Sequence, residues 1–194
     1  MSMLTQLNYA LKEWNVTINA LAKGQTILLL RKGGIREIGG RFNVKYDQVL
    51  LYPTYEHQNP NLLKSKYSSD VIKVNSGWHP ETISITSWTK ITDIFVIPEK
   101  STLDLLFNYH IWNQEFISDR FNWKPNQPLY LLLLKVYLLP NAGEINYQSE
   151  YGGCRSWLEL NQTIDISKSV PVLDDHEYDF KVEDIKKVIT RIKE

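Results

Sequence analysis

The sequence predicts an α+β fold with a mixed or barrel-like β-sheet and with helices near the N-terminus, in the centre and at the C-terminus. Several segments rich in leucine and β-branched residues are bounded by glycine or proline, which is typical of strands. Other segments carry apolar residues at the three- and four-residue spacing of helices. The predicted elements do not alternate as βαβ units do, so a doubly wound parallel sheet is not expected.

The length and composition favour one globular domain over residues 1–194. Hydrophobic residues make up 43% of the chain and charged residues 23%, close to the values for soluble globular proteins. The longest apolar run, Leu129–Leu134, is far shorter than the ~20 residues of a membrane helix, so no membrane partner is expected. A single cysteine and the lack of a secretion-signal pattern predict a cytoplasmic protein.

The first predicted element is an amphipathic helix over Thr5–Lys23, because its apolar residues follow helical spacing and Gly24 stands where helices often end. An alternative interpretation ends this helix near Trp14. Residues 16–20 would then form a short strand, since their alternation also fits a period of two.

Two strands and a glycine turn are predicted next. Thr26–Arg31 is leucine-rich and bounded by glycines, which predicts a central strand. Beyond the turn, Phe42–Tyr46 alternates and should pair with Val49–Tyr52 as a hairpin, and Pro53 should end that pairing.

The remaining elements follow from the same patterns. They are helical turns within Pro60–Lys66, one long or two consecutive strands over Thr82–Ile97, a helix capped by Ser101 that continues toward Phe121, a strand over Leu129–Leu139 buried on both faces, a loop over Asn141–Trp157, a short strand over Ser156–Leu160, and a terminal amphipathic helix over Phe180–Ile192.

Basic residues surround two glycine pairs between residues 33 and 40. Arg31, Lys32, Arg36 and Arg41 would suit phosphate recognition, because glycine permits close backbone approach and guanidinium groups bind phosphate oxygens well. The alternative is that these cations pair with nearby acids such as Glu37. The patterns GxxxxGK[ST] and GxGxxG are both absent.

A polar cluster follows at Tyr52, Tyr55, Glu56, His57 and Gln58. Glu56 and His57 are the candidate catalytic pair, since a carboxylate beside an imidazole can tune proton transfer near neutral pH. Adjacent strand residues point to opposite faces, so the pair needs a turn of the chain to act together. Hydrogen bonding that orders a loop or recognises the edge of a base is therefore favoured over catalysis.

A third cluster lies near Gly152 and Gly153. Arg155 and Trp157 occupy alternate positions and would hold a base by stacking if they share a face, although Trp157 is favoured as a core residue. Cys154 is expected to be a small buried side chain rather than a nucleophile. The four histidines are isolated, with no ligand spacing, so neither a metal nor a cofactor is expected.

The charge is uneven although the net charge is zero. Residues 1–90 hold 11 lysines and arginines against 6 acids, whereas residues 91–194 hold 11 against 16. Such an asymmetry indicates a polyanionic partner for the basic half, unless the halves neutralise each other.

Six motifs carry a resemblance to a known family. ALKEW, ILLLRKGGIRE, GRF, LLYPTYEHQ, LLLLKVYLLP and YGGCRSW resemble the signatures of the bacterial family DUF1802, a domain of unknown function. Some members of that family occur beside Mrr-type restriction endonuclease domains, which implies a restriction or defence setting. The AKGQT segment and the strand that follows are also similar to the opening of ASCH and other PUA-like domains, small barrels that commonly bind RNA or modified bases.

The leading hypothesis is a domain that binds nucleic acid or a nucleotide, in a defence or nucleic-acid-processing context. The ligand would contact the three clusters described above. One alternative is an enzyme of nucleic-acid or nucleotide chemistry that uses Glu56 and His57. Another is an interaction module with a protein partner in a defence system.

Overall fold

A computed structural model describes residues 5–32 and 46–190. The described strands are β1 (Gln6–Trp14), β2 (Leu28–Lys32), β3 (Gln48–Thr54), β4 (Thr82–Ile97), β5 (Leu129–Asn146), β6 (Trp157–Asp165) and β7 (Val170–Pro171). The α-helices are α1 (Asn15–Ala22), α2 (Ser65–Ser68), α3 (Lys100–Leu105), α4 (Gln114–Asn122) and α5 (Asp175–Thr190), with short 3-10 turns at Pro60–Leu62, Phe107–Tyr109 and Ser149–Tyr151.

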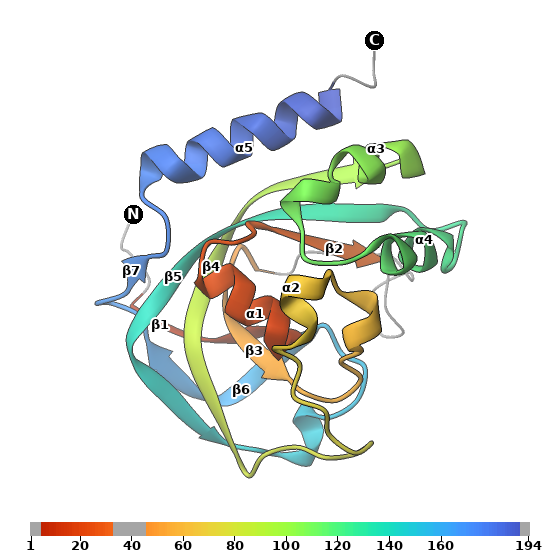
Figure 1. The fold of residues 1–194 in the computed structure, drawn as a ribbon. Helices are drawn as coiled ribbons and strands as arrows, with labels where there is room; N and C mark the ends of the chain where they lie inside the picture. The colour runs from red at the N-terminus through yellow and green to blue at the C-terminus, as the bar shows by residue number, and fades with distance from the viewer. Residues whose placement is uncertain (1–4, 33–45, 191–194) are drawn as a thin grey trace.

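The strands form one mixed sheet in the order β2-β5-β4-β3-β1-β6, with β7 pairing to β5. The pair β1–β3 is parallel and the other pairs are antiparallel. The long strands β4 and β5 curve together around α1, so the sheet is strongly bent (Figure 1). The α+β class with a mixed sheet is therefore confirmed, and the described strands form an open sheet rather than a closed barrel.

The bend brings β6 close to the far end of β5. At the point of approach, a Cβ atom added to Gly143 would lie 2.6 Å from Ile164 Cδ1 and 3.0 Å from Ile164 Cγ2. The buried Ile164 side chain thus occupies the space above the glycine. Glycine is required here by close packing, because any side chain would displace this isoleucine.

We expect Gly143→Ala to lower the free energy of unfolding by about 1–3 kcal/mol, the usual cost of overpacking. Urea denaturation measures the effect. In an Ile164→Ala background the added methyl has room, so the further cost of Gly143→Ala should fall close to zero. An equal cost in both backgrounds would contradict close packing against Ile164 as the cause.

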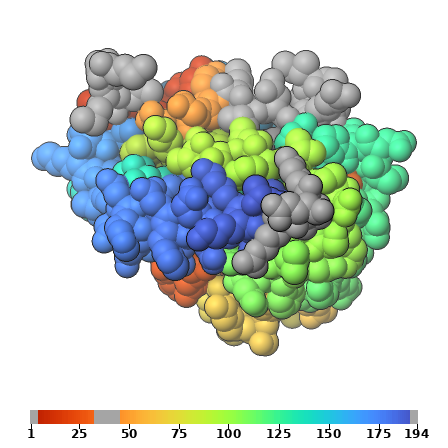
Figure 2. Space-filling model, turned by 90° about the horizontal axis from the view of Figure 1, so that it is seen from above, coloured from red at the N-terminus to blue at the C-terminus, as the bar shows by residue number. Residues whose placement is uncertain are grey.

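The core lies on both faces of β5. Leu131, Leu132, Leu133 and Leu134 have no exposed surface, which confirms the strand predicted to be buried on both faces. Helix α1 lies on the concave side of the sheet (Figure 1), and α5 packs against the same main cluster. Seen from above, α5 lies across the surface beside the segment that contains α3 (Figure 2).

The N-terminal prediction was wrong in both of its forms. The chain forms a strand to Trp14 and then a helix from Asn15, the reverse of the alternative order. Strand β1 lies between β3 and β6, and its two faces contribute to two different core clusters. A bulge between Leu7 and Tyr9 also breaks the alternation. Because β1 is buried on both faces and carries a bulge, the spacing of its apolar residues resembles that of a helix.

The prediction for the next strands needs three corrections. Strand β2 pairs with β5 at one end of the described strand order, so it is not central. Strand β3 pairs with β1 and β4, while residues 42–45 of the predicted hairpin lie outside the described residues. Pro53 does not end the pairing but aligns with Glu13 inside it. Strand β4 pairs with β3 only at Gln48–Leu50, so Pro53 lies beyond that ladder.

Several later elements agree with the predictions, but the helix predicted from Ser101 toward Phe121 is interrupted between Leu105 and Gln114. Thr82–Ile97 is one continuous strand with bulges near Ser87 and Asp93. Ser101 lies inside α3 rather than capping it, and Glu99 holds the cap position. Strand β5 continues to Asn146 through a segment predicted as loop, because its exposed residues there pair with β4 without an apolar pattern. The terminal helix is confirmed as α5, which begins at Asp175, before the predicted start, while residues 191 and 192 of the prediction lie outside the described residues.

Candidate functional site: a basic cleft at the end of the sheet

A cleft of about 230 Å³ lies where β1, β2, α4 and two loops meet, and we call it the basic cleft. Arg31 and Lys32, the loop after β3 and the segment Gly153–Ser156 all line it, so described members of all three predicted clusters come together although they are far apart in the sequence. Five cations and two carboxylates line its described part: Lys12, Arg31, Lys32, Arg120, Arg155, Glu13 and Glu56.

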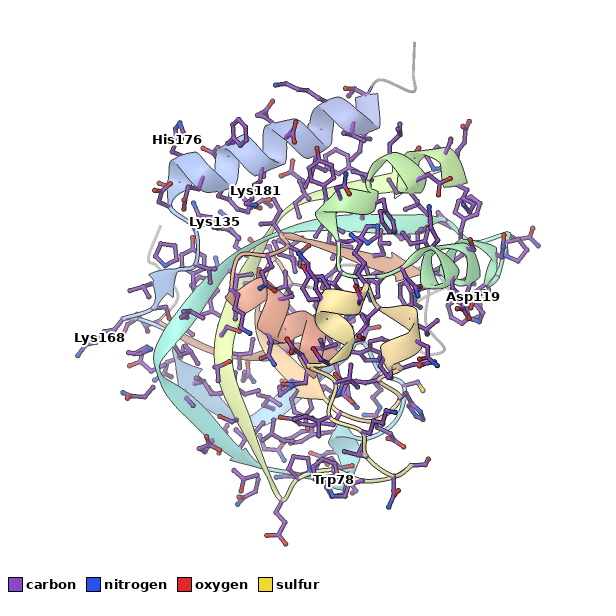
Figure 3. The ribbon with its side chains drawn as sticks, in the orientation of Figure 1. Trp78, Asp119, Lys135, Lys168, His176 and Lys181 are labelled. Atoms are coloured by element: carbon purple, nitrogen blue, oxygen red, sulfur yellow. The ribbon has the colours of Figure 1, made fainter. Side chains whose placement is uncertain are left out.

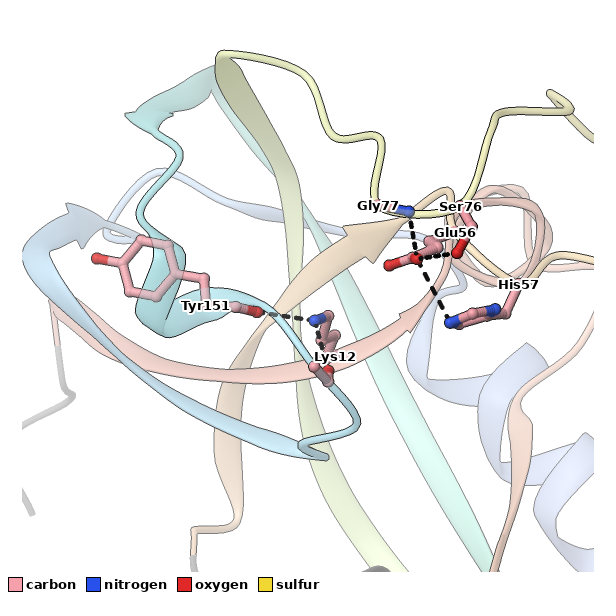
Figure 4. Close-up of polar contacts among 7 residues, drawn as sticks. Lys12, Glu56, His57, Ser76, Gly77 and Tyr151 are labelled. Carbon is pink, nitrogen blue, oxygen red and sulfur yellow. Dashed lines mark hydrogen bonds and ion pairs between the residues drawn. The ribbon is translucent and has the colours of Figure 1, made fainter.

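Lys12 joins the strand β1 to the distant loop. Its Nζ donates to the carbonyl oxygens of Tyr151 (2.7 Å) and Gly153 (3.0 Å), as Figure 4 shows for Tyr151. Burial lowers the pKa of this lysine below its ordinary value. Both partners are neutral carbonyl oxygens, so they fix the position of the ammonium group without neutralising its positive charge.

Arg31 forms the floor of the basic cleft together with Glu13. Arg31 Nη2 donates to the carbonyl oxygen of Lys12 at 2.6 Å and lies 3.6 Å from Glu13 Oε2. The two side chains are only 14% and 12% exposed, so the ion pair is largely removed from water. Arg31 Nε is buried and has no hydrogen-bond partner among the described residues, which leaves a donor for a ligand.

Helix α4 supplies another wall that combines cations with aromatic rings. Arg120 lies 5.1 Å from the ring centroid of Phe116, and that ring stacks on Trp112 with centroids 5.0 Å apart. The buried Lys32 donates to the carbonyl oxygen of Phe121. Burial and the nearby Arg120 lower the pKa of Lys32. Cations and flat rings therefore face one space.

The chain turns at His57, which has a backbone φ of +64°, and this turn lets Glu56 and His57 meet. Glu56 Oε1 accepts from the Gly77 N–H at 2.6 Å and from Ser76 Oγ at 3.3 Å, and lies 3.5 Å from His57 Nε2 (Figure 4). The Gly77 N–H is the main reason why the pKa of Glu56 lies below its ordinary value. The carboxylate is therefore ionised at neutral pH.

The other predicted residues lie in different places. Gln58 orders a loop, because its side chain accepts from Val16 N at the start of α1 and donates to Tyr55 O. Trp157 packs against the core and does not line the basic cleft, whereas Arg155 does. Cys154 is exposed and lines the cleft, so the expectation of a buried cysteine was wrong.

Tyr52 and Tyr55 line a second hollow that adjoins the basic cleft. Arg36, Glu37 and Arg41 lie outside the described residues, so their part in the site remains a prediction. Catalysis by Glu56 and His57 also remains a prediction, although the geometry brings the two side chains together.

Several cleft residues were missed by sequence reasoning. Lys12 and Glu13 were assigned to a helix, which hid the strand that presents them. Phe116 and Arg120 were missed although their four-residue spacing places them on one side of α4, a signal that was available in the sequence, while Trp112 precedes that helix. The sequence did not show that α4 and β1 line the same cleft.

Two further observations concern the part of the chain that the structure describes. It contains no group of three His, Cys, Asp or Glu side chains close enough to hold a metal ion. Among its helices, none is both long and apolar enough to cross a lipid bilayer.

The fold and the cleft define an α+β domain with a strongly bent mixed sheet and a basic, aromatic cleft. The chain belongs to the family described as Domain of unknown function (DUF1802), whose model matches residues 10–184. The resemblance of the sequence motifs to this family is thereby confirmed. No curated protein matches the sequence. The association with Mrr-type nucleases and a partner in a defence system remain predictions.

Solved structures similar to this chain include ASCH from Zymomonas mobilis. The crystal structure of that protein has 12% sequence identity and a TM-score of 0.46, covering 79% of this chain and 87% of its own. A point mutant of the same protein has 11% identity and a TM-score of 0.47, covering 91% of this chain and 96% of its own. ASCH is the class of domain that the AKGQT segment resembled.

Proposed function

We propose that the protein binds single-stranded nucleic acid or a nucleotide in the basic cleft. The observation that carries this proposal is that the cations of the cleft are held in position but only partly neutralised. Lys12 and Lys32 are held by backbone carbonyl oxygens, and within residues 5–32 and 46–190 only Arg31 among the lining cations forms an ion pair with a lining carboxylate. The positive potential of the cleft is fixed in position and only partly neutralised, which favours a ligand with phosphate groups.

The aromatic side chains favour a ligand with exposed bases over a duplex. Trp112 and Phe116 line the cleft but are only 2% and 7% exposed, so Trp123, with 41% of its surface exposed, is the ring most accessible to a base. Base stacking on aromatic rings combined with a basic groove is the usual way of binding single strands. In a duplex the faces of the bases are stacked on one another and are not available to these rings.

The test is fluorescence anisotropy with labelled single-stranded DNA, single-stranded RNA and duplex DNA at about 50 mM salt, where phosphate-driven affinity is strong. We expect the single strands to bind and the affinity to fall as salt is raised. Arg155→Ala should weaken binding about 10- to 150-fold, because one hydrogen bond to a charged group contributes about 1.5–3 kcal/mol. The slope of log K against log salt should fall by about 0.7 for one lost phosphate contact.

Lys168→Ala is the matched control. Lys168 projects from the side that carries β7, opposite to Asp119 of α4, and does not line the cleft (Figure 3). This variant should bind as the wild type does. No affinity for any of the three nucleic acids, or equal losses in Arg155→Ala and Lys168→Ala, would contradict binding in the basic cleft.

A further inference from the structure

A second hollow, of about 200 Å³, adjoins the basic cleft, and we call it the aromatic hollow. The two spaces share Lys12, Thr54, Glu56 and Gly153 as lining residues, so a single ligand can occupy both. The volume is below the roughly 300–1,000 Å³ that is usual for drug-sized ligands. It suits a single ring system rather than a whole nucleotide.

Aromatic rings form most of the wall of this hollow. The Tyr55 and Trp78 rings meet edge to face at 5.8 Å, and the His79 and Tyr147 rings stack with centroids 3.3 Å apart. Trp78 is 44% exposed and lies at the opposite end of the molecule from α5 (Figure 3). Four rings that already contact each other in pairs provide flat surfaces for a planar guest.

Two polar groups of the hollow have unused hydrogen-bonding capacity. Every contact of the Glu56 carboxylate with the described residues falls on Oε1, and the other oxygen projects away from Gly77 and Ser76 (Figure 4). Tyr52 is 2% exposed, and its hydroxyl has no hydrogen-bond partner among the described residues. A buried hydroxyl without a partner is destabilising, which is consistent with a partner supplied by a ligand.

We propose that the aromatic hollow holds one nucleobase with an exocyclic amino group, while the phosphates of the same strand lie in the basic cleft. This inference rests on the proposed function. The free oxygen of Glu56 would accept from the amino group, as carboxylates accept from cytosine N4. Thymine and uracil present a carbonyl oxygen at the equivalent edge, which an ionised carboxylate disfavours.

Lys12 lies at the boundary between the two spaces. Two of its three ammonium donors are used by Tyr151 O and Gly153 O, so the third remains for an anionic oxygen of the ligand. A phosphate or sugar oxygen next to the bound base would occupy this boundary. The same lysine thus links recognition of the base with binding of the backbone.

The test uses single strands of about eight nucleotides, within the site size of small single-strand-binding folds, made only of adenine, only of cytosine or only of thymine. We expect the adenine and cytosine strands to bind about tenfold more tightly than the thymine strand, as one hydrogen-bonded base contact would produce. In Glu56→Gln this preference should disappear or shift toward thymine, because the Gly77 N–H holds the amide oxygen and the amide nitrogen, which only donates, then faces the base. The amide oxygen can still accept from Gly77, so the loop should keep its conformation.

Two further variants separate ligand binding from structure. Tyr52→Phe should weaken binding of the adenine and cytosine strands about threefold without lowering Tm, because it removes a buried hydroxyl that has no partner in the described fold. Glu183→Gln, a change on α5 away from both spaces, is the matched control and should bind as the wild type does.

The outcomes distinguish the two proposals. Tighter binding of the adenine and cytosine strands that is lost in Glu56→Gln but kept in Glu183→Gln supports the base-binding hollow. Binding without a base preference, a preference for thymine, or a preference that Glu56→Gln leaves unchanged overturns this inference and leaves the basic cleft intact. No binding of any strand overturns both.

Discussion

Arg31→Met is expected to lower the free energy of unfolding by about 3 kcal/mol, because it leaves Glu13 largely buried without its cation. The two side chains are 14% and 12% exposed, and Arg31 also donates to the carbonyl oxygen of Lys12. Urea denaturation at neutral pH measures the loss. Adding Glu13→Gln should restore part of it, since the neutral amide no longer needs a counter-charge and can still accept from Trp14 N.

The exposed ion pair between Lys100 and Asp104 is the matched control for this prediction. Its atoms are 2.9 Å apart, but its side chains are 40% and 41% exposed. Lys100→Met should therefore cost less than about 1 kcal/mol, as is usual for surface pairs. Equal costs for the two substitutions would show that burial of the Arg31 pair has no special effect on stability.

Stability should fall in mild acid because of His110. This side chain is 2% exposed, and burial together with Lys64 lowers its pKa to about 3 from the ordinary 6.5. The folded protein keeps the imidazole neutral, whereas the unfolded chain binds a proton below pH 6.5. The contribution to stability is complete above pH 6.5 and is lost as pH falls toward 3, by about 1.4 kcal/mol per pH unit.

His110→Leu should flatten this part of the pH dependence. The measurement is the difference in unfolding free energy between pH 7 and about pH 5, taken from urea curves, where His110 accounts for roughly 2 kcal/mol in the wild type. His176→Gln, which changes an exposed histidine on α5, should leave the difference unchanged. If His110→Leu loses as much stability in acid as the wild type, another group is responsible.

The elements predicted correctly are those with one dominant local signal. Leu129–Leu134 is apolar at every position, Thr82–Ile97 alternates, and the residues of α5 follow helical spacing. The segment Leu7–Trp14 failed because its burial depends on its two neighbouring strands rather than on its own pattern. A strand covered on both faces has no clean period of two, so local spacing cannot identify it.

The candidate site was predictable only in part for a related reason. Glu56, His57 and Arg155 were identified because unusual residue types gather near them in the sequence. Lys12 was missed, and the contact of its ammonium group with Tyr151 O spans 139 positions of the chain. Contacts of that range arise from the sheet order, which a single sequence does not reveal. The placement of a side chain next to a distant carbonyl group therefore required the structure.

The position of Lys12 on an interior strand also has a kinetic consequence. Its strand is hydrogen-bonded to β3 on one side and β6 on the other, and its ammonium group is already fixed to two carbonyl oxygens. A ligand that arrives there meets a cationic centre that needs no rearrangement of the backbone. Association should then be limited by diffusion and electrostatic steering, so salt should act mainly on the association rate constant.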